Sequence, residues 1–446
     1  MAIGLMISNN SVLNILSCFP FGVYPPMDSK YAQLSVPNSV GTKVLASRVG
    51  ICIIIATALM GSGLPSPLYV LYQASYHLSN TWVNVLFSMY AVGVLVALML
   101  IVSFGDKIAD RRILIVSSSI LILLSSIIMI FASSQSELLV GRLLTGLGTG
   151  SVLGSASAAL LELDRHNNEK TTAILTTITF TLGSGLGPCV SGFLINAHWY
   201  PTITSYCVIM MLAFIALPLI CLTPLPVQNS SVETTDSHSH KINPLSNRGF
   251  WVASITVIAG WSVGAVFMSS GQLFTTHLAM VTNPFIAALL ITLFQFAAGI
   301  GQVSSGLIEQ KKAIAYGLSL CVAGQISMYF CAISAFTLGY QISSLLSGLG
   351  YGVSFVGATG LINREAPPSQ RASFISSYYV LAYIFGNAIP SLSVGTMIDH
   401  FDLAIAMRNF TCAVFLVLIL VLSLLKGLKK SPIHTLVQKN NSTSHS

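Results

Sequence analysis

Long apolar stretches, separated by short polar connections, make up most of this chain. A bilayer core about 30 Å thick is crossed by roughly 20 apolar residues in a helix. Backbone groups cannot stay unpaired in lipid, and these stretches lack the alternation of barrel strands, so each is predicted to be a transmembrane helix. Twelve spans are expected, at residues 49–72, 81–103, 113–132, 137–162, 171–195, 202–222, 250–276, 284–307, 314–334, 338–362, 372–398 and 403–425.

The basic residues are divided unequally between the connections. Those after the first, third, fifth, seventh, ninth and eleventh spans contain no Lys or Arg, whereas eighteen of the twenty basic residues lie in the opposite connections and the two ends. The positive-inside rule makes the basic side cytoplasmic. Both ends of the chain are then predicted to be cytoplasmic, in a multi-pass protein of the inner membrane.

Composition narrows the class of protein further. Hydrophobic residues make up 54% of the chain, charged residues only 7%, and the formal net charge is +7. An ordinary soluble domain is about 25% charged, so too few charges exist here to cover a soluble surface. A water-soluble enzyme, a disordered chain and a nucleic-acid binder are excluded. The eight cysteines and nine histidines have no spacing that favours metal ligation, so neither a metal nor a cofactor is expected.

A polar, Pro- and Ser-rich segment at 223–249 is predicted to be a cytoplasmic linker between two six-helix bundles, at 49–222 and 250–425. Residues 1–48 would form a cytoplasmic arm and residues 426–446 a cytoplasmic tail. Glycines repeat across this linker. Gly146, Gly148 and Gly150 recur 202 positions later as Gly348, Gly350 and Gly352, and Gly183 and Gly192 recur 203 positions later as Gly386 and Gly395. The repeat predicts a duplicated unit, an organisation in which many secondary transporters hold a site between the halves.

The loop GDKIADRR at 105–112 joins the second and third spans. Asp106, Lys107, Asp110, Arg111 and Arg112 place two acids and three bases between two helix ends. Such groups can pair and cap helix termini in one conformation and release them in another. The simpler alternative is a charged loop that only satisfies the positive-inside rule.

Arg142 is the basic residue whose position most needs an explanation. It lies about five residues, or roughly 7.5 Å, inside the outer end of the fourth span. Burial of an arginine in a membrane is costly, so a functional role is the first hypothesis. The alternative is a side chain that extends to the outer headgroups, towards Glu137. That pairing is poor, because five residues separate the two side chains by about 140° around a helix.

The fifth span contains GSGLGPCVSG. Gly183 and Gly187 give a face that a neighbouring helix can approach closely. Pro188 removes a backbone donor and can bend the helix, with Gly192 one turn further on. The pattern predicts a hinge beside a tight helix contact, against the alternative of ordinary helix packing.

Together these motifs resemble the major facilitator superfamily. Asp106, Lys107 and Arg111 match the acid and two of the basic positions of that family's loop signature, while Asp110 stands where the family has Arg. Arg142 with its following Thr and Gly residues matches the fourth-helix pattern. The fifth-span segment matches an antiporter pattern, except that a Ser replaces one Gly. The resemblance implies an all-α membrane protein, with twelve helices in two pseudo-symmetric six-helix bundles, and a loop at 105–112 that latches a cytoplasmic gate.

All thirteen acidic residues lie outside the middle of the spans. A buried carboxylate for proton coupling is therefore missing. Arg142 is the coupling candidate, with Glu162 and Asp106 as alternatives near helix ends. A cavity between the halves is expected to suit amphipathic or neutral organic compounds. Its candidate residues are Tyr69, Tyr72, Tyr90, Trp261, Gln272, Gln295, Tyr383 and Asn387.

The preferred interpretation is a monomeric secondary transporter that exports a small organic solute by alternating access, coupled to protons. An importer or facilitator of a metabolite is the alternative within transport. A polytopic membrane enzyme or sensor is the alternative from another class. No metalloprotease motif, paired carboxylates or nucleophile motif lies in or beside the spans, so the chain is not expected to be an enzyme.

Overall fold

A computed structural model describes residues 38–104, 111–164, 169–222, 244–367 and 370–428. Within these ranges every regular element is a helix. Twelve of the segments are long and apolar enough to cross a membrane. The all-α fold and the number of spans are thus confirmed. Asp106, Lys107 and Asp110 of the predicted latch lie outside the described residues, as do residues 223–243 of the predicted linker.

In the described residues of the first half there are seven helices. They are α2 (Asn38–Gly63), α3 (Pro65–Tyr76), α4 (Asn80–Phe104), α5 (Arg111–Phe131), α6 (Gln135–Glu162), α7 (Glu169–Asn196) and α8 (Pro201–Cys221). The second half begins with the short η3 (Pro244–Ser246), inside the predicted linker. It continues with α9 (Arg248–His277), α10 (Pro284–Ser304), η4 (Ser305–Leu307), α11 (Gln310–Ile333), α12 (Thr337–Glu365), α13 (Arg371–Leu381), the π-helix η6 (Ala382–Ala388), α14 (Ile389–His400) and α15 (Leu403–Lys426).

The first span differs from its expected form. The helix begins at Asn38, eleven residues before the predicted position, and is interrupted at Leu64. Helix α3 begins at Pro65. An amide hydrogen at the first position of a helix has no partner within the helix, so the lack of one in proline costs no hydrogen bond there. Several later helices begin at a side-chain cap, among them α6, α9, α10 and α15. For example, Asn283 accepts the amide hydrogens of Phe285 and Ile286 and so begins α10.

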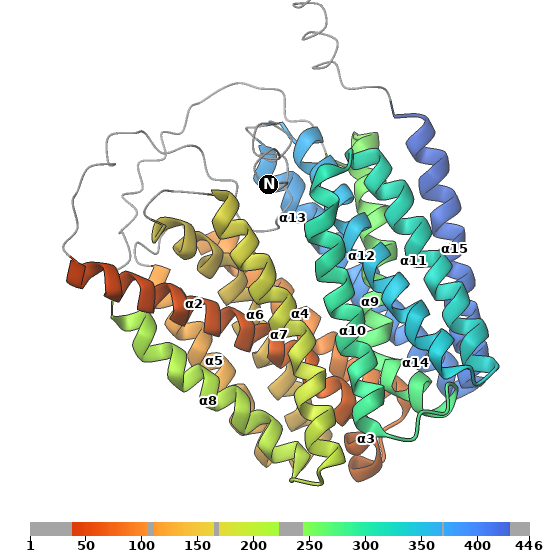
Figure 1. The fold of residues 1–446 in the computed structure, drawn as a ribbon, viewed down its shortest axis with the longest axis horizontal. Coiled ribbons are helices and arrows are strands. Elements are labelled where there is room, and N and C mark those ends of the chain that lie inside the picture. Colours follow the sequence, from red (N-terminus) through yellow and green to blue (C-terminus); the bar gives the residue numbers. More distant parts are fainter. Residues whose placement is uncertain (1–37, 105–110, 165–168, 223–243, 368–369, 429–446) are drawn as a thin grey trace, which may run out of the picture.

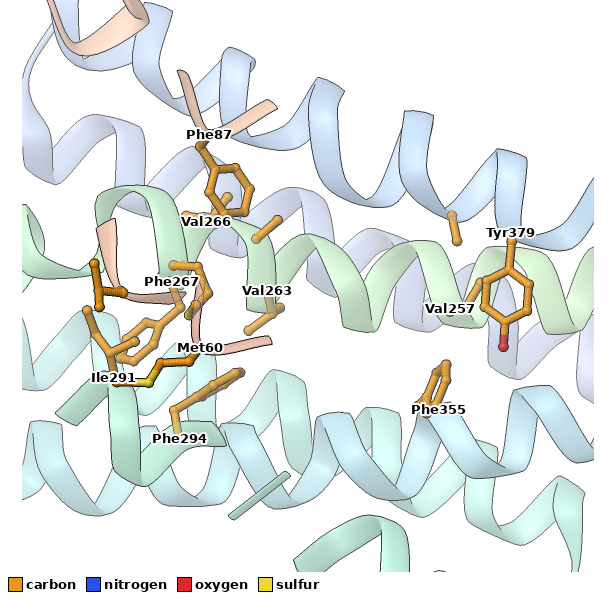
Figure 2. Packing of buried hydrophobic residues seen from close by; sticks show 14 of the residues in the cluster. Met60, Phe87, Val257, Val263, Val266, Phe267, Ile291, Phe294, Phe355 and Tyr379 are labelled. Atoms are coloured by element: carbon orange, nitrogen blue, oxygen red, sulfur yellow. The ribbon is translucent and has the colours of Figure 1, made fainter. Parts of the chain in front are cut away.

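The two halves lie side by side and converge towards one end (Figure 1). We name it the closed end. It carries the connections 77–79, 197–200, 278–283 and 401–402. The opposite end is the linker end. Buried hydrophobic residues from both halves form one cluster. In Figure 2, Met60 of α2 lies beside Ile291 and Phe294 of the second half, and Phe87 of α4 lies beside Val266 of α9.

The repeated glycines make equivalent contacts in the two halves. Gly146 packs on the backbone of Tyr90 in α4, and Gly348 packs on the backbone of Phe294 in α10. The contacted residues are 204 positions apart and the glycines 202. A side chain at either glycine would collide with the neighbouring backbone. The sequence repeat therefore corresponds to one packing plan used twice, with small residues that bring helices close together.

Candidate functional site

Two seams join the halves. The first is formed by α7, which lies between α2 and α10. Gly183 packs on the backbone of Ala56 in α2, and Gly192 packs on the side chain of Ala288 in α10. The predicted glycine motif therefore sits at the boundary between the halves. A bulkier residue at Gly192 would push α10 and the second half away from the first.

Pro188 lies inside α7, which continues as one helix through it. Proline has no amide hydrogen for the carbonyl of Ser184, four residues earlier. That carbonyl lies against Gly63, at the end of α2, where an added Cβ would be 2.8 Å from the oxygen. Pro188 of α7 therefore lies next to the interruption between α2 and α3. Its role as a hinge remains a prediction.

The second seam joins α4 to α14 and is the counterpart of the first. Gly395 packs on the side chain of Asn84, as Gly192 packs on Ala288. The glycines are 203 positions apart and their partners 204. Beside Gly395 two hydroxyl groups meet across the seam, because the Oγ atoms of Ser88 and Ser391 are 3.0 Å apart.

An aspartate closes the second seam at the closed end. Oδ1 of Asp399 accepts hydrogen bonds from the backbone and side-chain amides of Asn80, at 2.9 and 2.8 Å. Oδ2 accepts from the backbone amide and hydroxyl of Thr81, at 2.7 and 2.6 Å. Asn80 and Thr81 are the first residues of α4. A carboxylate of the second half therefore caps a helix of the first. We name these three residues the seam latch.

Arg142 is buried in the first half, with 1% of its surface exposed. Its Nη1 donates to the carbonyl of Gly61 at 3.2 Å and its Nε to that of Leu86 at 3.4 Å. The alternative that the side chain extends to the outer headgroups is therefore wrong. Glu137 does not pair with it and instead completes the cap that begins α6.

Tyrosines surround the guanidinium. Its carbon lies 5.0 Å from the ring centre of Tyr90, a cation–π distance. Tyr69 and Tyr206 are close enough to interact with the charge electrostatically. Nη2 of Arg142 has no hydrogen-bond partner of normal geometry among the described residues.

Aromatic residues gather around Trp261 in the second half. Its ring centre lies 6.1 Å from those of Phe355 in α12 and Tyr379 in α13, and 4.9 Å from that of Tyr383 in η6. We name these four residues the aromatic box. Phe355 and Tyr379 face each other in Figure 2, at a distance from the cluster around Phe294. Tyr383 lies in η6, which packs against α4, the helix that carries Tyr90.

The predicted cavity residues have different outcomes. Tyr90, Trp261, Tyr383 and Asn387 are only partly buried, and the last two share the π-helical turn η6. Tyr72 is buried and donates to the hydroxyl of Tyr206 at 2.9 Å, within the first half.

Three further candidates lie elsewhere. Tyr69 is 3% exposed and lies beside Arg142. Gln272 is buried and donates to the carbonyl of Pro284 at 3.4 Å, near the closed end. Gln295 is partly buried in α10.

Ion pairs fasten the linker end of the first half. Arg111, which opens α5, pairs with Glu162 at the end of α6 at 2.8 Å. Arg48 of α2 pairs with Asp164 at 3.2 Å. The described part of the predicted latch, Arg111 and Arg112, therefore lies where α5 and α6 meet. Across the residues that the structure places, no three His, Cys, Asp or Glu side chains gather as a metal site.

The model of the Major Facilitator Superfamily matches residues 51–391. The chain belongs to the major facilitator superfamily. The protein is thus a transporter of a small solute, and family membership points away from an enzyme.

Known proteins similar to this transporter agree with that assignment. The "Gallate transporter" of Pseudomonas putida is 22% identical over 428 residues, which cover 83% of this chain and 91% of that protein. The fold matches an inward-facing, unoccupied bacterial homologue of the human lysosomal transporter Spinster, with a TM-score of 0.71 at 12% identity over 86% of this chain and 96% of that one. It also matches the nucleoside transporter NupG, with a TM-score of 0.65 at 12% identity, over 86% and 99% of the two chains.

Several residues of the transporter's interior were not found from the sequence. Tyr206, Phe355 and Tyr379 lie in separate spans, and no sequence motif singles them out. Asp399 is one of the acidic residues near the end of a span. Only the pairing of α4 with α14 brings it to Asn80, although an acidic residue at a helix end is a signal worth testing for capping across halves.

Proposed function

We propose that this transporter exports a small organic solute in exchange for protons, by alternating access. The observation that carries the proposal is the pair of equivalent seams between the halves, together with a buried arginine in the first half and a box of aromatic side chains in the second. Rigid halves that touch at one end and hold polar and aromatic groups between them are what a rocking mechanism requires.

The orientation comes from the basic residues. Along the sequence, eighteen of the twenty lie in the connections opposite those of the closed end or in the two ends of the chain, so the linker end faces the cytoplasm. Both ends of the chain are then cytoplasmic, and the seams close the outer side of the inner membrane. In this orientation the described conformation is the inward-facing state of a monomer.

Export is supported by the antiporter-like pattern in α7, whose glycines and proline lie at the first seam. Arginine stays protonated in proteins, so Arg142 acts as a fixed charge that competes with a proton held nearby. Glu162, paired with Arg111 at the linker end, is the second group through which protons could act. Asp106 is the third.

Uptake or facilitated movement of a metabolite is the second candidate function. The observation that favours it is the similarity to a transporter of gallate, an aromatic acid. The two candidates differ in how a proton gradient affects the solute, so one experiment separates them.

The test uses the full chain in proteoliposomes, with radiolabelled candidate solutes and protein-free liposomes as the control for passive entry. Export by proton exchange predicts that an acidic lumen drives accumulation of the solute and that a protonophore abolishes it. Accumulation driven by an acidic outside would overturn export in favour of symport. Equal rates under both gradients would indicate a facilitator. Arg142→Ala serves as the inactive variant, and unchanged flux in that variant would remove Arg142 from the mechanism.

A further inference from the structure

The linker ends of the two halves hold their basic residues differently. In the first half, Arg111 at the start of α5 pairs with Glu162 at the end of α6, with 2.8 Å between nitrogen and oxygen. Arg48 of α2 pairs with Asp164 at 3.2 Å. The charges of both cations are thus balanced by carboxylates of the same half.

The equivalent junction of the second half carries a cation in place of an acid. The glycine repeat relates α6 to α12 at a shift of 202, which places Arg364 where the first half has Glu162. Nη1 of Arg364 donates to Oε1 of Gln310 at 3.3 Å, and Gln310 opens α11 as Arg111 opens α5. Glu365 lies 3.3 Å from Nη2 of Arg364 and so balances that charge. The carboxylate that neutralises the first half is therefore replaced.

Three basic residues of the second half surround the end of α15. Nζ of Lys311 donates to the carbonyl of Leu428 at 2.7 Å, and Nη2 of Arg248 donates to that of Leu424 at 3.3 Å. Lys426 lies in the last turn of α15 itself. The helices α9, α11 and α15 pack on one another, and α15 lies at the outer edge of the second half beside α11 (Figure 1). We name Arg248, Lys311 and Lys426 the basic triad.

The backbone carbonyls cap these cations without neutralising them. Each carbonyl carries only a partial negative charge and takes one donor of an ammonium that has three or a guanidinium that has five. Arg248 and Lys426 are exposed and Lys311 is partly exposed. No ion pair among the described residues includes a member of the triad. The positive-inside rule accounts for the sign of these charges, but not for the difference between the halves.

We propose that the basic triad binds the headgroup phosphate of an anionic phospholipid in the cytoplasmic leaflet. Basic pockets between transmembrane helices on the cytoplasmic side can bind such headgroups through their charge. The two capped carbonyls, of Leu424 and Leu428, are four residues or about 6 Å apart along a helix, so the two capping cations can act on one headgroup. The site goes beyond the proposed function, because it depends neither on the solute nor on the direction of transport.

The surface next to the triad follows the order of groups in a phospholipid. Trp251 is 38% exposed and lies three residues after Arg248, about 4.5 Å deeper along α9. Tyr316 of α11 is 66% exposed and lies five residues after Lys311. Exposed Trp and Tyr are typical of the headgroup level of a membrane. Deeper still, α15 exposes the aliphatic residues Leu416, Ile419 and Leu420. Charges, rings and aliphatic side chains thus match phosphate, glycerol backbone and acyl chains.

The test measures lipid binding to the full-length chain in detergent by native mass spectrometry. The probes are phosphatidylglycerol and phosphatidylcholine with the same acyl chains. We expect the unmodified chain to prefer phosphatidylglycerol. Each basic residue near an anionic headgroup contributes a factor of about five in affinity. The variant with Arg248→Gln and Lys311→Gln should therefore bind phosphatidylglycerol about 30-fold more weakly, with phosphatidylcholine binding unchanged.

Two further variants separate the site from overall charge. Lys43→Gln with Arg408→Gln removes the same charge from exposed positions outside the triad and should keep the preference. Arg248→Lys with Lys311→Arg retains both charges and should keep most of it. The readout is the ratio of two lipids bound by the same protein, so it does not depend on how much of each variant folds.

Three results would each overturn the proposal. They are equal binding of the two lipids by the unmodified chain, an undiminished preference in the variant with Arg248→Gln and Lys311→Gln, and an equal loss in the variant with Lys43→Gln and Arg408→Gln. Displacement of phosphatidylglycerol by an equal concentration of glycerol 3-phosphate would assign the triad to a soluble phosphate compound and also overturn it. Absence of solute flux would contradict the proposed function alone, because lipid binding is measured without transport.

Discussion

Asp399→Ala should shift the molecule away from the conformation described here. The seam latch consists of four hydrogen bonds, 2.6–2.9 Å long, from Asn80 and Thr81 to one carboxylate. Loss of an acidic N-cap costs about 0.5–2 kcal/mol within a single helix. Here the cap crosses the seam, so the cost falls only on the state in which the halves meet. Because Asp399 is exposed, we take about 1–2 kcal/mol, which changes the ratio of closed to open states about 5- to 30-fold.

The assay is the rate of maleimide labelling of Ser391→Cys, in a chain whose native cysteines have been replaced. Ser391 is fully buried in the same seam and becomes reachable when the seam opens. The rate should rise about 5- to 30-fold in Asp399→Ala, in proportion to the open population. Asp402→Ala is the matched control. Asp402 lies at the same end but caps its own helix, through the amide of Ile405 at 2.7 Å.

A labelling rate in Asp399→Ala within twofold of the parent would refute the reasoning. An equal rise in Asp402→Ala would refute it as well, since general loosening of the closed end would then explain the result.

Two further predictions concern stability. Gly192→Ala places a methyl group on Ala288 across the first seam, so the free energy of unfolding should fall by about 1–3 kcal/mol. In Gly271→Ala the nearest atom is at an ordinary 3.4 Å, and the melting temperature in detergent should not change. Glu162→Gln removes the charged partner of Arg111, whose side chain is 11% exposed, and should cost about 1–3 kcal/mol. Glu309→Gln breaks a pair whose side chains are 57–63% exposed and should cost less than about 1 kcal/mol. Equal effects within either pair of variants would contradict the assignment.

Hydropathy and charge placement predicted much of this fold. Twelve spans follow from the length of the apolar stretches, because lipid permits few alternatives to a helix. The repeated glycines, such as Gly146 and Gly348, also identified contacts that the structure contains, since close approach of two backbones requires small residues. Arg142 stood out from the sequence because a charge at that depth is expensive.

The remaining features depend on tertiary structure. The interruption at Leu64 and the π-helix η6 arise where helices adapt to their neighbours, and apolar periodicity does not record them. The aromatic box draws on three spans, that of Trp261 included. Asp399 finds its partners 319 and 318 residues earlier in the chain. No local pattern carries such pairings, so they became visible only when the two halves were placed together.

The central claim is that the two halves separate at the closed end in every transport cycle. Ser88→Cys and Ser391→Cys place two thiols where the hydroxyl groups are 3.0 Å apart across the second seam. Ser327→Cys and Ser343→Cys form the control pair, 2.8 Å apart within the second half. Oxidation of the first pair should stop solute flux in proteoliposomes and reduction should restore it, while oxidation of the second pair should leave flux unchanged. Undiminished flux through a fully cross-linked first pair would contradict the account.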